Sequence, residues 1–412
     1  MTDNKQAKKA VSLQRISDTT MGLLFILNMV LYVAAGESIS AAVDSARTVY
    51  AERGETTTIY IAPENYEEEL TIDVPGLRLI NSAETPSIGL RNGGADIDEN
   101  AVRITWYYGH GYQYASMGGA FNYGGKRTRR WNASVLVDAP DFYAEGIIFE
   151  NSFNQYISAR EAQDTLVDIS QAQNDWTANE RPKRLMPMRP KEAGSTEVQR
   201  KMYIERAAAI SFTERATHAV LKNCRCVGHQ DVLYGDQGAS VYMDGGVLQG
   251  GVDFIFGGLM LAVDRATIVV NVSDEKGDKC YISASRNDPD GTHETADKYG
   301  NPAPGANPRG MLFYRCHIRF ATEDELAHPG HTPAYLARPW RWWGETVWAY
   351  TTWDEGCVAA EGWHTGLTKG AACPYSYEYQ SQDGSERRPE WVQVLPTPTL
   401  PDGTEIVPEN WK

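Results

Sequence analysis

The sequence has little of what marks several common classes of protein. Its 412 residues contain six cysteines, too few for a fold of this size to depend on disulfide bonds. Lysine and arginine number 39 against 54 aspartate and glutamate, a formal net charge of −15, which argues against nucleic acid or an anionic membrane surface as a partner. No dense acidic cluster resembles a calcium loop. We predict neither a metal ion nor an organic cofactor.

The apolar run near the N-terminus falls short of a membrane span. It extends from Met21 to Gly36 and follows basic residues up to Arg15, but it is too short for a comfortable transmembrane helix, so no membrane partner is predicted. Residues 1–36 are open to two interpretations, the middle of a signal peptide or a first buried strand. Secreted and cytoplasmic locations therefore stay equally open.

Short apolar strands are the dominant pattern in the rest of the chain. Hydrophobic residues make up 42% of the sequence, enough for a sizeable core. Segments such as ASVLVDAP, AAAISFTE and ASVYMDGG recur with polar or glycine punctuation at intervals of roughly 20 to 25 residues, which is typical of a stacked β-solenoid. A helical period is visible only near residues 38–52, where we expect a helix that caps the open end of the solenoid.

The solenoid rhythm divides the chain into three parts. We predict an N-terminal segment at 1–36, one domain at 37–395 and a tail at 396–412, either an extended wrap or disordered. Two insertions break the rhythm at 155–203 and 286–310. Solenoids carry such insertions as loops, often beside the binding face.

Two aspartates carry the strongest chemical signal. Asp231 and Asp253 lie in the phrases GHQDVLYGDQG and GGVDFIFGG, and their separation of 22 residues is close to one coil of a right-handed parallel β-helix. If they occupy the same strand of successive coils, their backbones approach within about 5 Å. Two carboxyl groups that close do not ionise together easily, so their pKa values should split into an acid and a base or nucleophile.

Cysteine and histidine offer a weaker alternative site. Cys224 and Cys226 share one face of a strand and stand near His218 and His229, so a metal site is conceivable. Buried packing is the favoured interpretation, because cysteine is among the most buried residue types.

Several phrases in order resemble those of the pectin methylesterases (pectinesterases), carbohydrate esterase family 8. GHQDVLY is similar to the family's G-Y-Q-D-T-L-Y, GGVDFIFG to G-x-V-D-F-I-F-G, and LARPW to L-G-R-P-W, followed by the pair Gly362 and Trp363. The resemblance covers roughly residues 37–395. It implies an all-β, single-stranded right-handed parallel β-helix that hydrolyses galacturonate methyl esters of homogalacturonan to pectate and methanol.

The resemblance also implies a role for each matching residue. Asp253 would attack the ester carbonyl, and Asp231 would protonate departing methanol and then activate water. Arg338 would hydrogen-bond Asp253 and orient it. Gln230 would stabilise the tetrahedral oxyanion, a contribution of about 3 kcal/mol.

Aromatic residues near these positions are the candidate substrate contacts. Trp340 would pack against a sugar ring beside the scissile ester, with Trp363 a weaker candidate. Tyr234 and Phe256 are equally compatible with the core and with the binding face.

One position departs from the family pattern. The family places a second oxyanion glutamine about one coil before the G-Y-Q-D phrase, where an ungapped comparison puts Arg206 in RAAAI. Its guanidinium would donate hydrogen bonds to an oxyanion, or would pair with Asp231 and lower the pKa of that acid. A slip in the alignment would instead turn Glu205 inward.

Alternative functions differ in their products. An esterase or thioesterase for another acyl group would keep the fold and the aspartate pair, and Arg206 would mark the change. A lyase or polygalacturonase would cleave the polysaccharide chain, and a silent carbohydrate-binding solenoid would have no need of both aspartates. We predict methyl-esterified pectin or oligogalacturonides as the partner of a monomeric enzyme.

Overall fold

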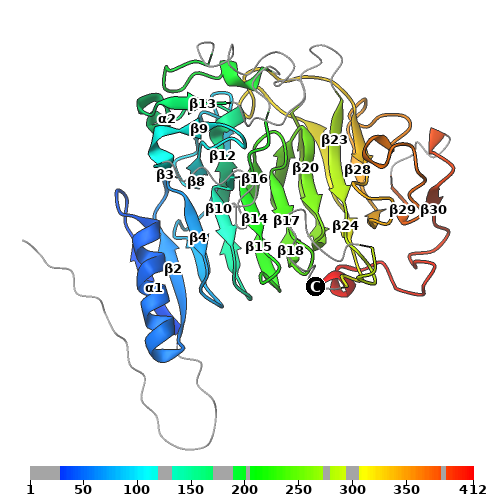
Figure 1. The fold of residues 1–412 in the computed structure, drawn as a ribbon, viewed down its shortest axis with the longest axis horizontal. Helices are drawn as coiled ribbons and strands as arrows, with labels where there is room; N and C mark the ends of the chain where they lie inside the picture. The colour runs from blue at the N-terminus through cyan, green and yellow to red at the C-terminus, as the bar shows by residue number, and fades with distance from the viewer. Residues whose placement is uncertain are drawn as a thin grey trace, which may run out of the picture.

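The strands stack into a parallel β-helix whose coils follow one another along the long axis of the molecule (Figure 1). The computed structural model describes residues 28–118, 132–169, 189–200, 205–271, 279–293, 306–381 and 387–412. Within these ranges, three parallel sheets form the walls of the solenoid, and each complete coil contributes one strand to each sheet.

The eleven-stranded sheet consists of β1 (Asn28–Val33), β2 (Thr56–Ile61), β5 (Arg78–Asn81), β11 (Tyr143–Glu145), β15 (Ala219–Lys222), β18 (Ser240–Asp244), β21 (Met260–Asp264), β24 (Met311–Tyr314), β27 (Thr346–Ala349), β29 (Ser376–Tyr379) and β30 (Val392–Val394). The seven-stranded sheet consists of β4 (Leu70–Ile72), β10 (Val135–Val137), β14 (Ile210–Phe212), β17 (Leu233–Gly235), β20 (Val252–Gly257), β23 (Cys280–Ser285) and β26 (Ala334–Ala337). The eight-stranded sheet consists of β3 (Glu64–Glu67), β8 (Val102–Trp106), β12 (Ile147–Asn151), β16 (Arg225–Val227), β19 (Val247–Gly250), β22 (Thr267–Val270), β25 (His317–Phe320) and β28 (Thr352–Trp353).

Columns of like side chains hold the coils in register. Ile210, Leu233 and Ile255 are partners on three successive strands of the seven-stranded sheet, and all three side chains are fully buried. The column continues the interior core, which runs through the described coils. Alternation along each strand places one set of side chains in this core and the other set outside. The β-solenoid predicted from the strand spacing is confirmed.

A helix and a strand occupy the N-terminal end. The helix α1 (Ile39–Arg53) begins at Ser38, whose side chain accepts a hydrogen bond from a backbone amide of the first turn, and ends at Gly54 in the left-handed conformation. It packs against β1 and β2, as Figure 1 shows at the blue end. The helix predicted near residues 38–52 is therefore present, and its protective role at the open end stays a prediction. Part of the 21–36 apolar run forms β1, which pairs with β2.

The loops carry the remaining short elements. These are the strand pairs β6 (Leu90–Arg91) with β7 (Asp96–Ile97) and β9 (Gln113–Tyr114) with β13 (Leu166–Asp168), the helix α2 (Ala159–Gln163), and the 3-10 turns η1 (Ala115–Met117), η3 (Ser152–Asn154), η5 (Glu197–Gln199), η8 (Gly366–Thr368) and η10 (Pro408–Trp411). The tail after residue 395 folds back, and its Trp411 is fully buried beside Leu400 and Ile406. Of the two alternatives for the tail, the structure has the ordered wrap.

All six cysteines are buried and free. Cys224 and Cys226 belong to the interior core, and burial raises the pKa of Cys224 to about 12. Packing, the favoured interpretation of these two residues, is what the structure has. No helix among the described residues has the length and apolar character needed to cross a bilayer.

Candidate active site

The two aspartates lie opposite each other on adjacent coils. Gln230 is the partner of Val252, and Leu233 is the partner of Ile255, so Asp231 faces Asp253 in the same register. The backbone amide of Asp231 donates to the carbonyl oxygen of Val252 at 3.2 Å. The two carboxyl groups therefore project from neighbouring backbones, as the one-coil separation predicted.

Both aspartates stand on left-handed backbone. Their φ angles are 59° for Asp231 and 46° for Asp253, a region that residues other than glycine seldom occupy. The register between β20 and β23 also shifts between Val252 and Ile255. Bulges of this kind re-aim side chains and are frequent beside active sites. The local backbone at Asp231 and Asp253 thus departs from the regular alternation of side chains along a strand.

Arg338 donates two hydrogen bonds to the carboxylate of Asp253. Its Nε donates to Oδ1 and its Nη2 to Oδ2, each at 2.6 Å. The backbone amide of Arg338 donates to the carbonyl oxygen of Ser283, which ties the arginine to β23. Burial acts to lower the pKa of Arg338, but the charge of Asp253, the hydrogen bonds to that carboxylate and the nearby Tyr281 and Asp231 together outweigh burial, and the net shift of the pKa is upward. A fork of this geometry fixes the orientation of the carboxylate.

Asp231 has the opposite environment. Its side chain is buried, and burial raises its pKa well above the usual range; the positive charge of Arg206 acts against that shift, and the negative charge of Asp253 reinforces it. One carboxylate thus has an arginine fork, while burial favours the protonated form of its neighbour. That division is the one expected for an acid beside a nucleophile.

Arg206 occupies the coil before Gln230. The two residues form a parallel bridge, and the amide of Ala207 donates to the carbonyl oxygen of Gln230 at 3.2 Å. The side chain of Glu205 is fully buried, and its Oε1 lies 3.8 Å from Nε of Arg206. The ungapped register, with Arg206 rather than Glu205 in line with Gln230, is the one that the structure has.

Three aromatic rings form a cluster on the outer side of the seven-stranded sheet. The Tyr234 and Phe256 rings lie 4.6 Å apart, and Phe256 lies 5.3 Å from Trp340. Tyr234 and Phe256 are each 4% exposed, whereas Trp340 is half-buried and packs against their cluster. Trp340 therefore offers surface for a ligand, and the other two rings support it from below.

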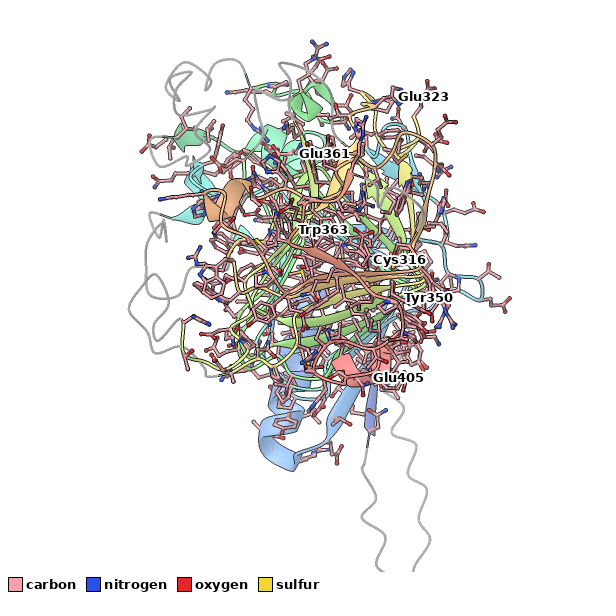
Figure 2. All side chains as sticks on the ribbon, turned by 90° about the vertical axis from the view of Figure 1, so that its right-hand side faces the viewer. Cys316, Glu323, Tyr350, Glu361, Trp363 and Glu405 are labelled. Carbon is pink, nitrogen blue, oxygen red and sulfur yellow. The ribbon has the colours of Figure 1, made fainter. Side chains whose placement is uncertain are left out.

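The expectation that Trp363 contacts substrate is wrong in this structure. Its side chain is 2% exposed and belongs to the interior core, and its Nε1 donates to Oε1 of Glu378. Figure 2, a view of the C-terminal end, shows it among the strands of the coil. A sugar ring cannot stack on an indole that is buried this completely. The signal that misled was the glycine–tryptophan pair, which does not specify the direction of the side chain.

Tyr281 contacts the site without having been assigned a role from the sequence. The guanidinium carbon of Arg338 lies 3.8 Å from the centre of its ring. Tyr281 is the register partner of Val252 on one side and of Tyr335 on the other. Counting one further coil from Val252 could have found it, but the register shift in β20 hides that count.

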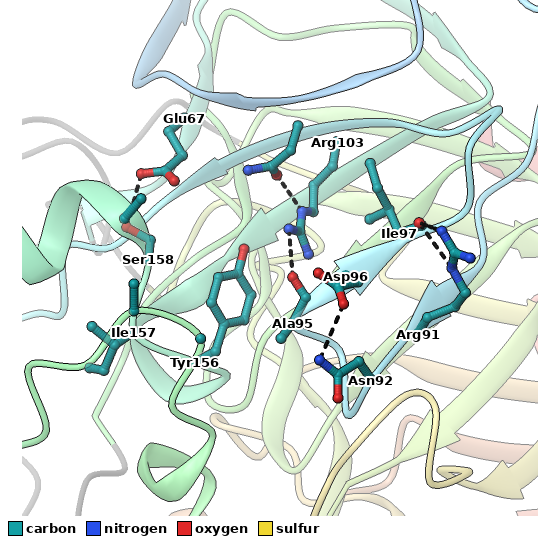
Figure 3. Close-up of a pocket in the computed structure, with 14 residues that line it drawn as sticks. Glu67, Arg91, Asn92, Ala95, Asp96, Ile97, Arg103, Tyr156, Ile157 and Ser158 are labelled. Carbon is teal, nitrogen blue, oxygen red and sulfur yellow. Dashed lines mark hydrogen bonds between the residues drawn. The ribbon is translucent and has the colours of Figure 1, made fainter.

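Two other features lie apart from the aspartate pair. Among the described residues, one group has ligand atoms close enough to hold a metal ion, namely Asp288, Asp290 and His293 in the second insertion. A hollow of about 640 Å³ lies among the first coils, between β3, the β6–β7 loop and residues 156–159 (Figure 3). Its lining contains none of the residues assigned to catalysis or substrate contact.

Comparison with known proteins finds a likeness to one family. The pectinesterase family model matches residues 197–394, the stretch that contains both aspartates and the arginine fork. This part of the chain is similar to the pectinesterases. Pectinesterase 4 of Arabidopsis thaliana is 30% identical over 213 residues, which cover 50% of this chain and 32% of the relative.

The likeness to solved structures extends over most of the chain. The pectin methylesterase from carrot is 16% identical, with a TM-score of 0.55 over 93% of this chain and 91% of that one. A pectin methylesterase in complex with a hexasaccharide is 19% identical, with a TM-score of 0.52 over 86% and 89% of the two chains. These likenesses confirm the parallel β-helix.

The chain spans about a quarter to a half of the length of the curated pectinesterases that it matches. The activity of this chain is therefore a proposal that rests on its own residues.

Proposed function

We propose that this protein hydrolyses the methyl esters of galacturonate units in homogalacturonan, releasing pectate and methanol. The observation that carries the proposal is the pairing of a carboxylate held in an arginine fork, Asp253, with a buried carboxyl group on the adjacent coil, Asp231, whose pKa is raised by burial. The match of residues 197–394 to the pectinesterase model supports the same activity, and the comparisons do not favour the alternative acyl substrates.

The reaction begins at Asp253. One carboxylate oxygen attacks the ester carbonyl and forms a tetrahedral oxyanion, for which Gln230 and Arg206 supply hydrogen-bond donors. As the oxyanion collapses, the bond to methoxide breaks and Asp231 gives that oxygen its proton, so methanol leaves. The product is an acyl-enzyme in which Asp253 carries the galacturonyl group as an anhydride.

Water completes the cycle. Asp231, now a carboxylate, takes a proton from a water molecule that attacks the acyl carbonyl. The anhydride breaks, Asp253 leaves as a carboxylate, and the galacturonate acid is released. Both aspartates return to their starting protonation states, so no external proton donor is needed.

Substrate contact falls to Trp340. Its half-buried ring packs against the ring of Phe256, which is on β20, the strand that contains Asp253. The flat faces of pyranose rings pack well on aromatic surface. A related pectin methylesterase has been solved with a hexasaccharide, and we extend that class of ligand, methyl-esterified oligogalacturonide, to this chain.

Methanol release from highly methylated pectin tests the proposal. We expect release by the wild type and none above background with Asp253→Ala, because loss of a nucleophile typically costs roughly 10⁴-fold or more. Equal release by both proteins would exclude Asp253 as the nucleophile. No release by a folded wild type would refute the pectin substrate and direct the search to other acyl esters.

A further inference from the structure

Arg338 has a contact that the proposed chemistry does not use. Besides its fork on Asp253, its guanidinium carbon lies 3.8 Å from the ring centre of Tyr281, the distance of direct stacking contact. Tyr281 is 8% exposed. A desolvated cation over an aromatic face is held more strongly than one at the surface.

The Tyr281 ring is itself held on several sides. Tyr335, its register partner on β26, stacks on it at 5.5 Å with 19° between the ring planes. His364 stands edge-on to both rings, at 5.5 Å from Tyr281 and 5.0 Å from Tyr335. Lys279 lies 5.5 Å from the Tyr335 ring centre. Residues from three segments of the chain thus immobilise one ring.

The packing of the Tyr281 ring restricts a motion of the Arg338 guanidinium that its two hydrogen bonds leave free. Two parallel hydrogen bonds fix the guanidinium along the carboxylate, but they let it tilt about the line through the two oxygens. A ring against the guanidinium face limits that tilt. Asp253 stands on left-handed backbone, a conformation that persists only where the surrounding contacts hold it. The fork of Arg338 is one of those contacts.

We propose that Tyr281 is a positioning residue of the site: its ring face supports the Arg338 guanidinium, which aims the Asp253 carboxylate, and Tyr335 and His364 hold the ring in place. The role is assigned to the ring face, which Tyr281→Phe keeps and Tyr281→Leu removes. The inference rests on the proposed function for its kinetic consequence, while the contact itself is measurable without substrate.

The kinetic test compares ring removal with ring retention. We expect Tyr281→Leu to lower kcat for methanol release by about 10- to 30-fold, the range of a buried cation–π contact expressed as a rate. KM should stay within about 3-fold, because Tyr281 does not touch the substrate. Tyr281→Phe should keep kcat within about 3-fold of wild type.

A matched control exists elsewhere on the solenoid. Arg78 lies 3.8 Å from the ring centre of Tyr143, the same contact at the same distance on the eleven-stranded sheet. Tyr143→Leu removes it, and we expect kcat and KM to stay unchanged. A loss of kcat shared by Tyr281→Leu and Tyr143→Leu would make the effect one of general stability and overturn the proposal.

A spectroscopic test does not depend on activity. The Nε–H resonance of Arg338, identified by its loss in Arg338→Lys, should carry a ring-current shift in wild type and Tyr281→Phe and lose it in Tyr281→Leu. If Tyr281→Leu does not fold, Tyr281→Met serves for both measurements. An unmoved resonance, or a moved resonance with unchanged kcat, overturns the proposal. A wild type that releases no methanol refutes the proposed function, and the resonance still decides whether Tyr281 positions Arg338.

Discussion

Two of the arginine–carboxylate pairs of this solenoid, one in the first coils and one in the later coils, are built differently. In the first coils, Arg103 and Glu150 have side chains that are 3% and 1% exposed. In the later coils, Arg338 and Asp253 are 17% and 10% exposed. The charges are the same, so the difference between the pairs lies in their other partners.

The first pair has its hydrogen bonds distributed through a network. Arg103 donates to Asn65 and to the carbonyl oxygens of Gly94 and Ala95 as well as to Glu150. Glu150 accepts in addition from Thr105 and Tyr156. Figure 3 shows Arg103 in the wall of the hollow, with its hydrogen bond to Ala95. A buried charge pair with so many partners serves the structure.

The second pair is simpler and less shielded. Arg338 places both arms of its fork on Asp253, and the adjacent carboxyl group, Asp231, has its pKa raised by burial and by the charge of Asp253. The comparison indicates that an ion pair becomes a candidate for chemistry when a second carboxyl group shares its site and part of the site stays open to solvent.

The largest contrast is expected from replacing a carboxylate by an amide in each region. Asp231→Asn should lower kcat by about 10²- to 10⁴-fold, the usual contribution of a general acid, while raising the melting temperature at pH 7 by roughly 2 °C or more. Glu150→Gln should lower the melting temperature, because its donors lose a charged acceptor. Thermal unfolding and methanol release measure both effects.

The stability gain in Asp231→Asn should depend on pH. The folded protein retains the Asp231 proton above about pH 4, where the unfolded chain releases it, so the cost of this residue grows as the pH rises through that window. At pH 4 and below, wild type and variant should therefore differ little. A gain that is constant from pH 4 to pH 7 would contradict the raised pKa.

The arginines of the two pairs should separate stability from activity. Arg103→Met leaves Glu150 buried without its counter-charge, and we expect the free energy of unfolding to fall by about 3–5 kcal/mol, with kcat of the folded enzyme unchanged. Arg338→Met should lower kcat by roughly 100-fold or more, the scale of a preorganised electrostatic contact, at a smaller cost in stability. Urea unfolding and kinetics on both variants test this; equal losses of stability would remove the distinction between the pairs.

The smallest effect is expected at Arg206. Its positive charge acts to lower the pKa of Asp231, so Arg206→Gln should raise that pKa further. The basic limb of the pH profile of kcat/KM would then move to higher pH by about 0.5 to 1 unit. Because glutamine still donates to the oxyanion, kcat/KM at the optimum should stay within about 10-fold of wild type. Arg91→Gln, at the hollow of the first coils, is the matched control and should leave the limb in place.

Local pattern sufficed to predict the repeat and the aspartate pair. Coil length is set by apolar residues that recur within a few strands, so the column of Ile210, Leu233 and Ile255 is visible in the sequence. The same arithmetic predicted Asp231 opposite Asp253. It did not predict the left-handed backbone at both aspartates or the register shift beside β23, because a bulge depends on the neighbouring coil.

Side-chain direction was the weakest part of the prediction. Trp363 follows a glycine in a phrase that suggested a ligand surface, yet its indole fills the core and binds Glu378. The sequence predicted no role for Tyr281, although its ring lies against the guanidinium of Arg338. Alternation along a strand predicts the face of a residue, but loops and bulges interrupt the count.

The sequence by itself determined the coil repeat, the apolar columns and the spacing of the two acids, because each follows from residues about one coil apart. The pairing of Arg338 with Asp253 was implied only by the family resemblance, and the tertiary structure decided its geometry and the ring that lies against it. Arg338 and Asp253 are 85 residues apart, with the second insertion between them. Their contact depends on how successive coils stack, a property of the folded chain that no local pattern contains.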